Sequence, residues 1–319
     1  MSHVVAPLQL GCCPDEPRCL LCPPPPHPPT PEYVSALVQY YRTERAEPGD
    51  EVWAAFYGGP PPSDALLRAA GNVPKRVRVR PDLLSRDDAR RVVDAGVTAI
   101  ELDAVSFDDR VLREARRPYR AALLDEMLVG LRGLGVRVGV VLWPGLPGSS
   151  FESSIADARH AAPLVDTARL HPALVLRGSA LQAAHIDGLY RPLELGEAVT
   201  VCRAMMDVLE EAAVQVIRVG LQPGPDGYGK ALAGPRHPAL RELVEARRTL
   251  EALHDLVDGT PPGTHVVIRC APPDEARTRG PFNQHIRDLR ARFGLSGVQI
   301  RPDPDLPRGA WAVTLGEEP

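Results

Sequence analysis

The chain has 319 residues, a length for one large domain or two ordinary ones. Hydrophobic residues make up 44% and charged residues 24%, a composition that is typical of globular proteins and excludes a disordered chain. The formal net charge of −4 excludes a protein that coats nucleic acid nonspecifically, because that binding needs a large positive surplus. No apolar run is long enough to span a membrane, and residues 1–10 lack a signal-peptide pattern, so we expect a cytoplasmic protein.

The first two thirds of the chain alternate between strand and helix patterns. Strands are predicted at residues 3–10, 52–57, 76–80, 98–104, 137–142, 168–176 and 215–221. Helices are predicted at residues 32–46, 63–70, 85–95, 120–134, 150–162 and 193–213. This alternation implies right-handed βαβ units and a parallel sheet. Length and strand count favour the α/β class and a partial (β/α) barrel, in which the chemistry lies at the carboxyl ends of the strands.

The pattern changes after residue 223. A glycine-rich segment at 224–238 precedes elements that do not continue the barrel: a helix at 239–257, a strand at 265–270, a helix at 283–293 and a strand at 297–301. We therefore predict three parts of the chain. They are an N-terminal strand with a cysteine-cluster loop at 1–30, a partial barrel at 31–223, and a small α+β C-terminal domain at 224–319.

Four cysteines lie within eleven residues directly after the first predicted strand: Cys12, Cys13, Cys19 and Cys22. In a reducing compartment such a cluster indicates a metal site rather than disulfides. Three thiolates from one loop, Cys13, Cys19 and Cys22, can bind three irons of a [4Fe–4S] cluster and leave the fourth iron open. Cys12 is an alternative first ligand. A zinc site made by the same three cysteines and His27 is the competing interpretation.

This cysteine loop, together with Gly58 and Gly59 at the end of the second predicted strand, resembles the radical S-adenosylmethionine (SAM) superfamily. Further motifs occur in the order found in Elongator-catalytic-subunit-like radical SAM proteins, and the chain is similar to the short members that lack the acetyltransferase domain. These motifs are residues 55–59, 80–82, 100–109, 144–148, 175–181, 190–193, 217–223 and 233–239.

The resemblance implies a [4Fe–4S] cluster and SAM as cofactors, with Cys13, Cys19 and Cys22 as the cluster ligands. It implies that Gly58 and Gly59 bind the amino group of SAM through their backbone. Around the ribose, adenine or substrate it places the loop at 144–148 and the side chains of Asp82, Glu101 and Ser106.

The implied reaction is reductive cleavage of SAM to a 5′-deoxyadenosyl radical, which abstracts hydrogen from a substrate. The substrate is not identified, RNA is one candidate, and no catalytic side chain is assigned. The implied partner is an electron donor such as ferredoxin or flavodoxin, and no membrane partner is expected. We expect the chain to be too short for an acetyltransferase domain, so acetyl transfer is not carried over.

Some features depart from the family pattern, and two explanations compete: an active enzyme with a variant loop, or a divergent barrel that has lost SAM cleavage. The second functional hypothesis is a noncatalytic barrel with a structural zinc site that acts as a binding or scaffold module, although the prolines after Cys22 stiffen the reach to His27. The first cysteine gap is five residues long, Leu21 replaces the aromatic residue that the family places before its last cysteine, and four prolines follow Cys22. Pro60 and Val105 also depart from the family pattern.

Other candidate site residues are two histidines and two arginines at predicted strand ends or loops: His171, His237, Arg80 and Arg177. The histidines could bind substrate or move protons, or they could be hydrogen-bonded structural groups. The arginines could bind phosphate or carboxylate, or they could pair with Glu and Asp. A local basic face is predicted at Arg277, Arg279 and residues 287–292, where a solvated helix surface is the commoner meaning. Cys202 and Cys270 are predicted to be core residues.

Overall fold

The computed structural model describes residues 3–10, 20, 29–221 and 231–316. The chain forms two compact units, Met1–Pro238 and Ala239–Pro319, and each is described by itself. Among the described residues, no helix combines the length and the apolar character needed to cross a bilayer.

The first unit is built on a seven-stranded sheet in the order β1-β2-β3-β4-β5-β6-β8. Every pair of neighbouring strands is parallel. The strands are β1 His3–Gln9, β2 Glu51–Tyr57, β3 Lys75–Val79, β4 Val97–Val105, β5 Arg137–Leu142, β6 Thr167–Leu170 and β8 Gln215–Val219. This sheet confirms the predicted partial barrel.

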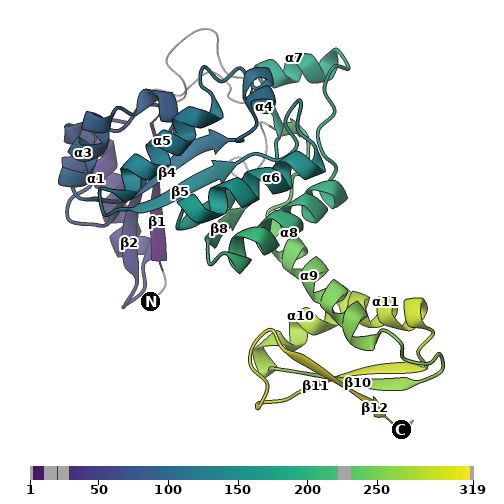
Figure 1. The fold of residues 1–319 in the computed structure, drawn as a ribbon. Helices are drawn as coiled ribbons and strands as arrows, with labels where there is room; N and C mark the ends of the chain where they lie inside the picture. The colour runs from purple at the N-terminus through teal and green to yellow at the C-terminus, as the bar shows by residue number, and fades with distance from the viewer. Residues whose placement is uncertain (1–2, 11–19, 21–28, 222–230, 317–319) are drawn as a thin grey trace. The chain divides into compact units, whose positions relative to one another are not determined.

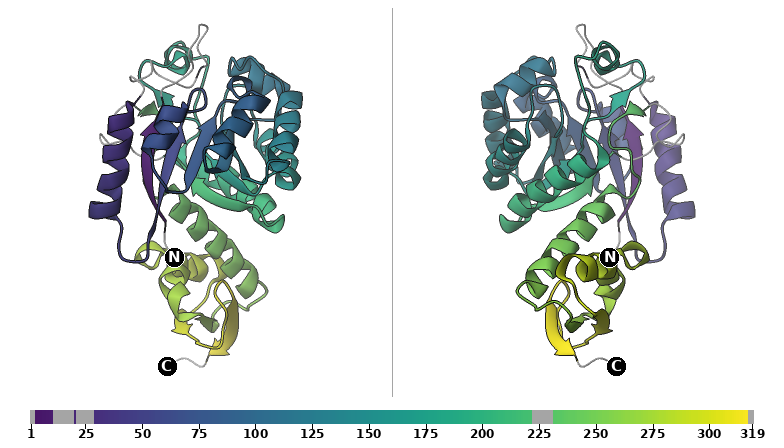
Figure 2. Two further views of the ribbon diagram at one scale, coloured as in Figure 1. Left: turned by 90° about the vertical axis from the view of Figure 1, so that its left-hand side faces the viewer. Right: turned by 90° about the vertical axis from the view of Figure 1, so that its right-hand side faces the viewer.

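Helices surround the sheet, as Figures 1 and 2 show. They are α1 Pro31–Tyr40, α2 Asp64–Ala69, α3 Arg86–Asp94, α4 Asp109–Glu114, α5 Ala121–Arg132, α6 Phe151–Ala161, α7 Ala180–Ile186 and α8 Leu195–Glu211. Their starts follow local chemistry, because hydroxyl side chains accept hydrogen bonds from otherwise unpaired amide groups of the first turn. Ser63 caps α2 and Ser85 caps α3 in this way, as the sequence predicts.

Two predicted elements are wrong in part. The helix predicted at 32–46 is α-helical only to Tyr40 and continues as a π-helical turn, Tyr41–Arg45. The strand predicted at 168–176 leaves the sheet after Leu170, and its last residues form β7, Val175–Leu176, in a separate two-stranded sheet. Pro172 explains the break, because proline has no amide hydrogen for a central strand. Helices α4 and α7 lie in segments where none is predicted.

The boundary between the two units lies later in the chain than residue 223, where the sequence pattern changes. Strand β9, Ala231–Ala233, pairs in antiparallel fashion with β7 of the first unit. This pairing keeps the segment before Pro238 with the barrel.

The second unit confirms a small α+β domain. Its three-stranded sheet has the order β11-β10-β12. Strand β10, His265–Cys270, is parallel to β11, Gly297–Pro302, and antiparallel to β12, Trp311–Gly316, which the sequence analysis missed. The helices are α9 Leu240–Val257, α10 Glu275–Arg279 and α11 Gln284–Phe293. Apolar side chains from the sheet and from α9 and α11 form its core.

Candidate active site at the carboxyl ends of the strands

The predicted cluster ligands Cys13, Cys19 and Cys22, with Cys12 and His27, lie outside the described residues. Within the described part of the chain, no three His, Cys, Asp or Glu side chains are grouped as metal ligands would be.

Leu20, between two of the predicted cysteine ligands, is described. It is buried, its amide donates to the carbonyl of Ala115 at 3.3 Å, and its carbonyl accepts from the amide of Leu181 at 3.0 Å. Ala115 ends α4 and Leu181 lies in the first turn of α7. Leu20 is therefore hydrogen-bonded to two helices, and each of them follows the carboxyl end of a strand. The sequence analysis expects the chemistry at the carboxyl ends of the strands.

Gly58 and Gly59 end β2 with backbone φ angles of 83° and 70°, a conformation that glycine adopts without strain. The amide of Gly58 donates to the carbonyl of Arg78 at 3.1 Å, which holds the turn against β3. The amide of Leu10, just after β1, donates to the carbonyl of Tyr57 at 3.0 Å. The end of β2 therefore lies beside Leu10, the last described residue before the cysteine loop. A turn without side chains leaves its backbone open to close approach, and the contact with SAM stays a prediction.

Glu101, predicted near the ribose or adenine, is the centre of a closed charged group on the inner face of the sheet. Its carboxylate accepts from Arg169 Nε at 2.7 Å and Nη2 at 3.2 Å, and it pairs with Arg76 Nε at 3.2 Å. The Arg169 guanidinium lies 5.7 Å from the Tyr57 ring centroid, and that of Arg76 lies 5.3 Å from the Trp53 centroid. We call Arg76, Glu101 and Arg169 the Glu101 layer. Both carboxylate oxygens are taken by arginines, so this layer joins β3, β4 and β6.

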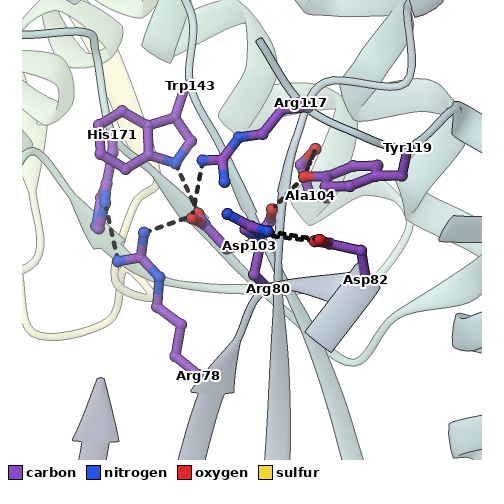
Figure 3. A network of polar contacts seen from close by, with 9 residues as sticks. All are labelled: Arg78, Arg80, Asp82, Asp103, Ala104, Arg117, Tyr119, Trp143 and His171. Carbon is purple, nitrogen blue, oxygen red and sulfur yellow. Dashed lines mark hydrogen bonds and ion pairs between the residues drawn. The ribbon is translucent and has the colours of Figure 1, made fainter. Parts of the chain in front are cut away.

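Asp103, which the sequence analysis did not single out, is the centre of a second group nearer the strand ends (Figure 3). Its Oδ1 accepts from Arg78 Nη2 at 2.8 Å and from Trp143 Nε1 at 2.9 Å, and its Oδ2 accepts from Arg117 Nη2 at 3.1 Å. Burial alone would raise the pKa of Asp103, but the charges of Arg78 and Arg117 outweigh it and lower that pKa. We call Arg78, Asp103, Arg117, Trp143 and His171 the Asp103 layer.

A bulge in β4 accompanies this arrangement. Leu102 pairs with Val140, whereas the next pair joins Val105 to Leu142, so β4 contains one more residue than β5 between the two pairs. Val105 has a φ of 70°, which is strained for a β-branched residue. Such bulges redirect side chains near functional sites. Asp103 lies within the bulge, and only the sheet register reveals it.

His171, predicted as a candidate at the end of the sixth strand, belongs to the Asp103 layer. Its Nδ1 lies 3.5 Å from Arg78 Nη1, and its ring meets Trp143 edge-on at 5.4 Å. Burial lowers the pKa of His171 well below its usual value, and the charges of Arg78, Arg169 and Arg218 lower it further. The imidazole is therefore neutral. Because a guanidinium can only donate, Nδ1 is the acceptor and the ring proton is on Nε2.

Asp82 and Arg80, both candidates from the third strand end, bind each other. Asp82 accepts from Arg80 Nε at 2.7 Å and from Nη2 at 2.6 Å, in a bidentate pair. Both side chains are largely buried. The role of Asp82 toward SAM or substrate stays a prediction, and a ligand would meet the carboxylate with its charge already paired.

Ser106 is buried at the end of β4. Its Oγ accepts from the amide of Asp108 at 3.0 Å, and it bonds with Asp157 of α6. Burial raises the pKa of Asp157 to about 6, although hydrogen bonds from the Phe107 amide and from Ser106 oppose the rise. These contacts join β4 to α6, and a contact of Ser106 with SAM stays a prediction.

The loop Pro144–Gly148 follows β5 and is held by contacts with Tyr190 and Leu193. Tyr190 Oη donates to the Gly145 carbonyl at 2.6 Å. Gly145 has a φ of 86°, and a Cβ there would lie 2.6 Å from Leu193. The motifs at 144–148 and 190–193 are therefore partners in packing.

The remaining candidates are not members of the Glu101 layer or the Asp103 layer, and they differ in burial. His237 is half-buried after β9, and Arg177 is exposed after β7. Cys202 of α8 and Cys270 of β10 are fully buried, as core residues are.

The predicted basic face of the second unit is partly neutralised by its own contacts. Arg279 pairs with Glu275 at 2.7 Å, and Arg287 donates to the carbonyl of Phe282. Arg292 lies over the ring of Phe293, with 5.8 Å between the guanidinium and the centroid. These arginines therefore lie on solvent-exposed helix surfaces, where their charges interact with neighbouring residues of the same unit.

Comparison with solved structures shows which proteins share this fold. The fold is similar to that of the Elp3 protein of Methanocaldococcus infernus, with a TM-score of 0.61 and 16% identity over 84% of this chain and 71% of that chain. It is also similar to methylornithine synthase, with a TM-score of 0.53 and 14% identity over 74% of this chain and 76% of that one. Residues 165–252 match the radical SAM C-terminal domain family. The chain therefore shares the fold of radical SAM enzymes and resembles that superfamily over this segment.

Sequence comparison narrows the resemblance to the Elongator type. A tRNA uridine(34) acetyltransferase of Dehalococcoides mccartyi is 29% identical over 176 residues, which are 54% of this chain and 38% of that protein. The protein of the same name from Methanocaldococcus infernus is 26% identical over 129 residues, which are 39% of this chain and 24% of that protein. The predicted resemblance to Elongator-like radical SAM proteins is confirmed, and the matches span less than half the length of these relatives.

Proposed function

We propose that the protein is a radical SAM enzyme in which Cys13, Cys19 and Cys22 bind a [4Fe–4S] cluster with one open iron. The observation that supports the proposal is the position of the cysteine triplet in the sequence. It follows β1 of a partial barrel of the radical SAM type, and Leu20 within it is fastened at the carboxyl ends of the strands.

The described residues provide the surroundings of such a reaction. Gly58 and Gly59 offer a turn without side chains for the amino group of SAM. The two charged layers cover the inner face of the sheet and hold the strand ends in fixed register. When bound, the cluster and SAM supply an electron and a 5′-deoxyadenosyl radical that removes hydrogen from a substrate carbon. This chain's own residues position the ligands and exclude water.

We propose an RNA as the substrate, because the similar proteins are named for a reaction on tRNA uridine. An external electron donor such as ferredoxin or flavodoxin completes the proposal. Acetyl transfer is left aside, because the matched region covers 38% or less of those relatives.

The decisive experiment is anaerobic reconstitution with iron and sulfide. We expect broad absorbance near ~400 nm and about four irons per chain. Addition of dithionite and SAM should yield 5′-deoxyadenosine, and Cys19→Ala should abolish both the colour and the product. Cys202→Ala is the matched control, because this buried cysteine belongs to the core of the barrel.

A colourless protein that binds one zinc per chain would contradict the proposal and favour the noncatalytic barrel. Iron loading that survives Cys19→Ala would contradict the ligand assignment.

A further inference from the structure

We propose that the Asp103 layer and Arg218 form a phosphate-binding site on the inner face of the sheet, made by Arg78, His171 and Arg218. Binding of phosphate at this site does not depend on the proposed function. Only the assignment of that phosphate to the substrate of the radical SAM reaction rests on it. The shared chemistry is a phosphate group, on an RNA backbone or on a small phosphorylated molecule.

The first argument is charge. Arg218 of β8 is the register partner of Arg169, so the two side chains project from the same face of the sheet. Arg76 and Arg169 share the single carboxylate of Glu101, and Arg78 binds Asp103. Among the described residues Arg218 has no carboxylate partner, and its Nε donates to the carbonyl of Gly220 at 3.3 Å.

Within the part of the chain that the structure describes, these four arginines therefore face two carboxylates, and His171 is neutral. Arg117 adds a further guanidinium at Asp103, with its side chain 2% exposed. A surplus of positive charge in a place with little water is costly unless an anion accompanies it. The face is thus built for a ligand that carries more than one negative charge.

The second argument is the set of fixed donors. Arg78 is held by Asp103 at 2.8 Å, and its guanidinium lies 5.6 Å from the Trp143 centroid. Arg78 makes Nδ1 of His171 the acceptor, so the other ring nitrogen, Nε2, carries a hydrogen and has no protein acceptor among the described residues. The site therefore has one neutral donor, His171 Nε2, and charged donors from Arg78 and Arg218. The protonation of these groups does not change with pH near neutrality. Guanidinium groups in fixed orientation match phosphate oxygens.

SAM does not account for this surplus. The molecule carries a positive sulfonium and a positive amino group against one carboxylate, so it adds no net negative charge. A phosphate group does supply the missing charge. In this arrangement Asp103 is a positioning residue, because it orients Arg78 and Arg117 without facing the ligand itself.

The test is binding of inorganic pyrophosphate to the full-length protein, measured anaerobically by calorimetry at two salt concentrations. We expect binding that weakens with salt, and an affinity at least about tenfold lower for Arg218→Gln. Arg218→Lys keeps the charge but loses the planar fork, and we expect an intermediate affinity. Arg137→Gln is the matched control, because Arg137 begins β5 at the opposite end of the sheet and is exposed.

Competition identifies the source of the phosphate. A short single-stranded RNA that displaces pyrophosphate assigns the site to the RNA backbone, whereas a nucleotide that displaces it when RNA does not assigns it to a small molecule. Folding of each variant is checked by thermal unfolding, and Arg218→Lys keeps the test valid if Arg218→Gln does not fold.

The proposal is overturned if the wild-type protein does not bind pyrophosphate, or if Arg218→Gln and Arg218→Lys bind it as the control variant does. Wild-type protein that forms 5′-deoxyadenosine yet binds no pyrophosphate overturns this inference alone. Protein that binds pyrophosphate but never cleaves SAM leaves the phosphate site standing and overturns the proposed function.

Discussion

Three residues of the Asp103 layer, Arg78, Asp103 and His171, each lie two positions after a residue of the Glu101 layer, yet the two layers differ in which of their polar groups are paired. In the Glu101 layer, both carboxylate oxygens bind arginines and both arginines lie against aromatic rings of β2. In the Asp103 layer, Asp103 binds three donors, and no described residue accepts the ring hydrogen of His171. The difference shows that buried charge by itself does not mark a binding site. A closed group joins strands, whereas a group with spare fixed donors can take a ligand.

The largest expected effect on stability comes from removing the carboxylate of the Glu101 layer. Glu101→Ala leaves the guanidinium groups of Arg76 and Arg169 without a partner in a buried place, and we expect a loss of about 3–5 kcal/mol in the free energy of unfolding. Urea unfolding measures it. Glu126→Ala is the control, because it breaks the exposed Arg86–Glu126 pair, for which about 1 kcal/mol or less is expected. Equal losses in the two variants would show that the Glu101 layer is not a structural clamp.

The second largest effect is a pH dependence of stability caused by Asp157, a largely buried carboxyl group to which no described arginine is paired. In the folded protein the pKa of Asp157 is raised to about 6, from 3.8. The folded state therefore holds its proton more tightly than the unfolded state does, so stability falls as pH rises from about 4 to 6. The loss is on the order of 2–3 kcal/mol, and unfolding measured across that range should show it.

Asp157→Asn should flatten this dependence, because the amide does not titrate and its oxygen can still accept from the Phe107 amide. The contribution of Asp103 to stability depends on pH in the opposite direction. The pKa of Asp103 is lowered, so its contribution is present above the unfolded pKa and is lost as pH falls below about 4. An unchanged slope in Asp157→Asn would refute the assignment of the pH dependence to this carboxyl.

The smallest expected effect tests the space beside Glu101. A Cβ at Gly139 would lie 2.4 Å from Thr167 Oγ1 and 3.1 Å from Glu101 Cγ, so Gly139→Ala should cost about 1–3 kcal/mol of stability. Gly130 lies in α5 with open space around it, and Gly130→Ala should instead stabilise by up to about 1 kcal/mol. Thermal unfolding of both variants gives the comparison, and a neutral Gly139→Ala would mean that the layer can shift.

Much of the barrel could be predicted because its signals are local. The alternation of apolar and polar residues marks strands such as β3, and serines with glycines mark where helices begin and end. The prediction failed where a partner far along the chain decided the outcome. Residues 175–176 look like the continuation of a strand, but Pro172 and pairing with β9 place them in a different sheet.

The candidate site divides in the same way. Cysteine spacing and the Gly58–Gly59 turn are properties of short segments, so the radical SAM resemblance was visible in the sequence alone. Arg78, Asp103, Trp143 and His171 come from four strands or strand ends. His171 is a candidate in the sequence, whereas the other three look ordinary in their own segments. Strand order, register and the bulge in β4 bring them together. Which carboxylate is paired and which donor is spare depends on distances across the sheet, and only the tertiary structure decides those distances.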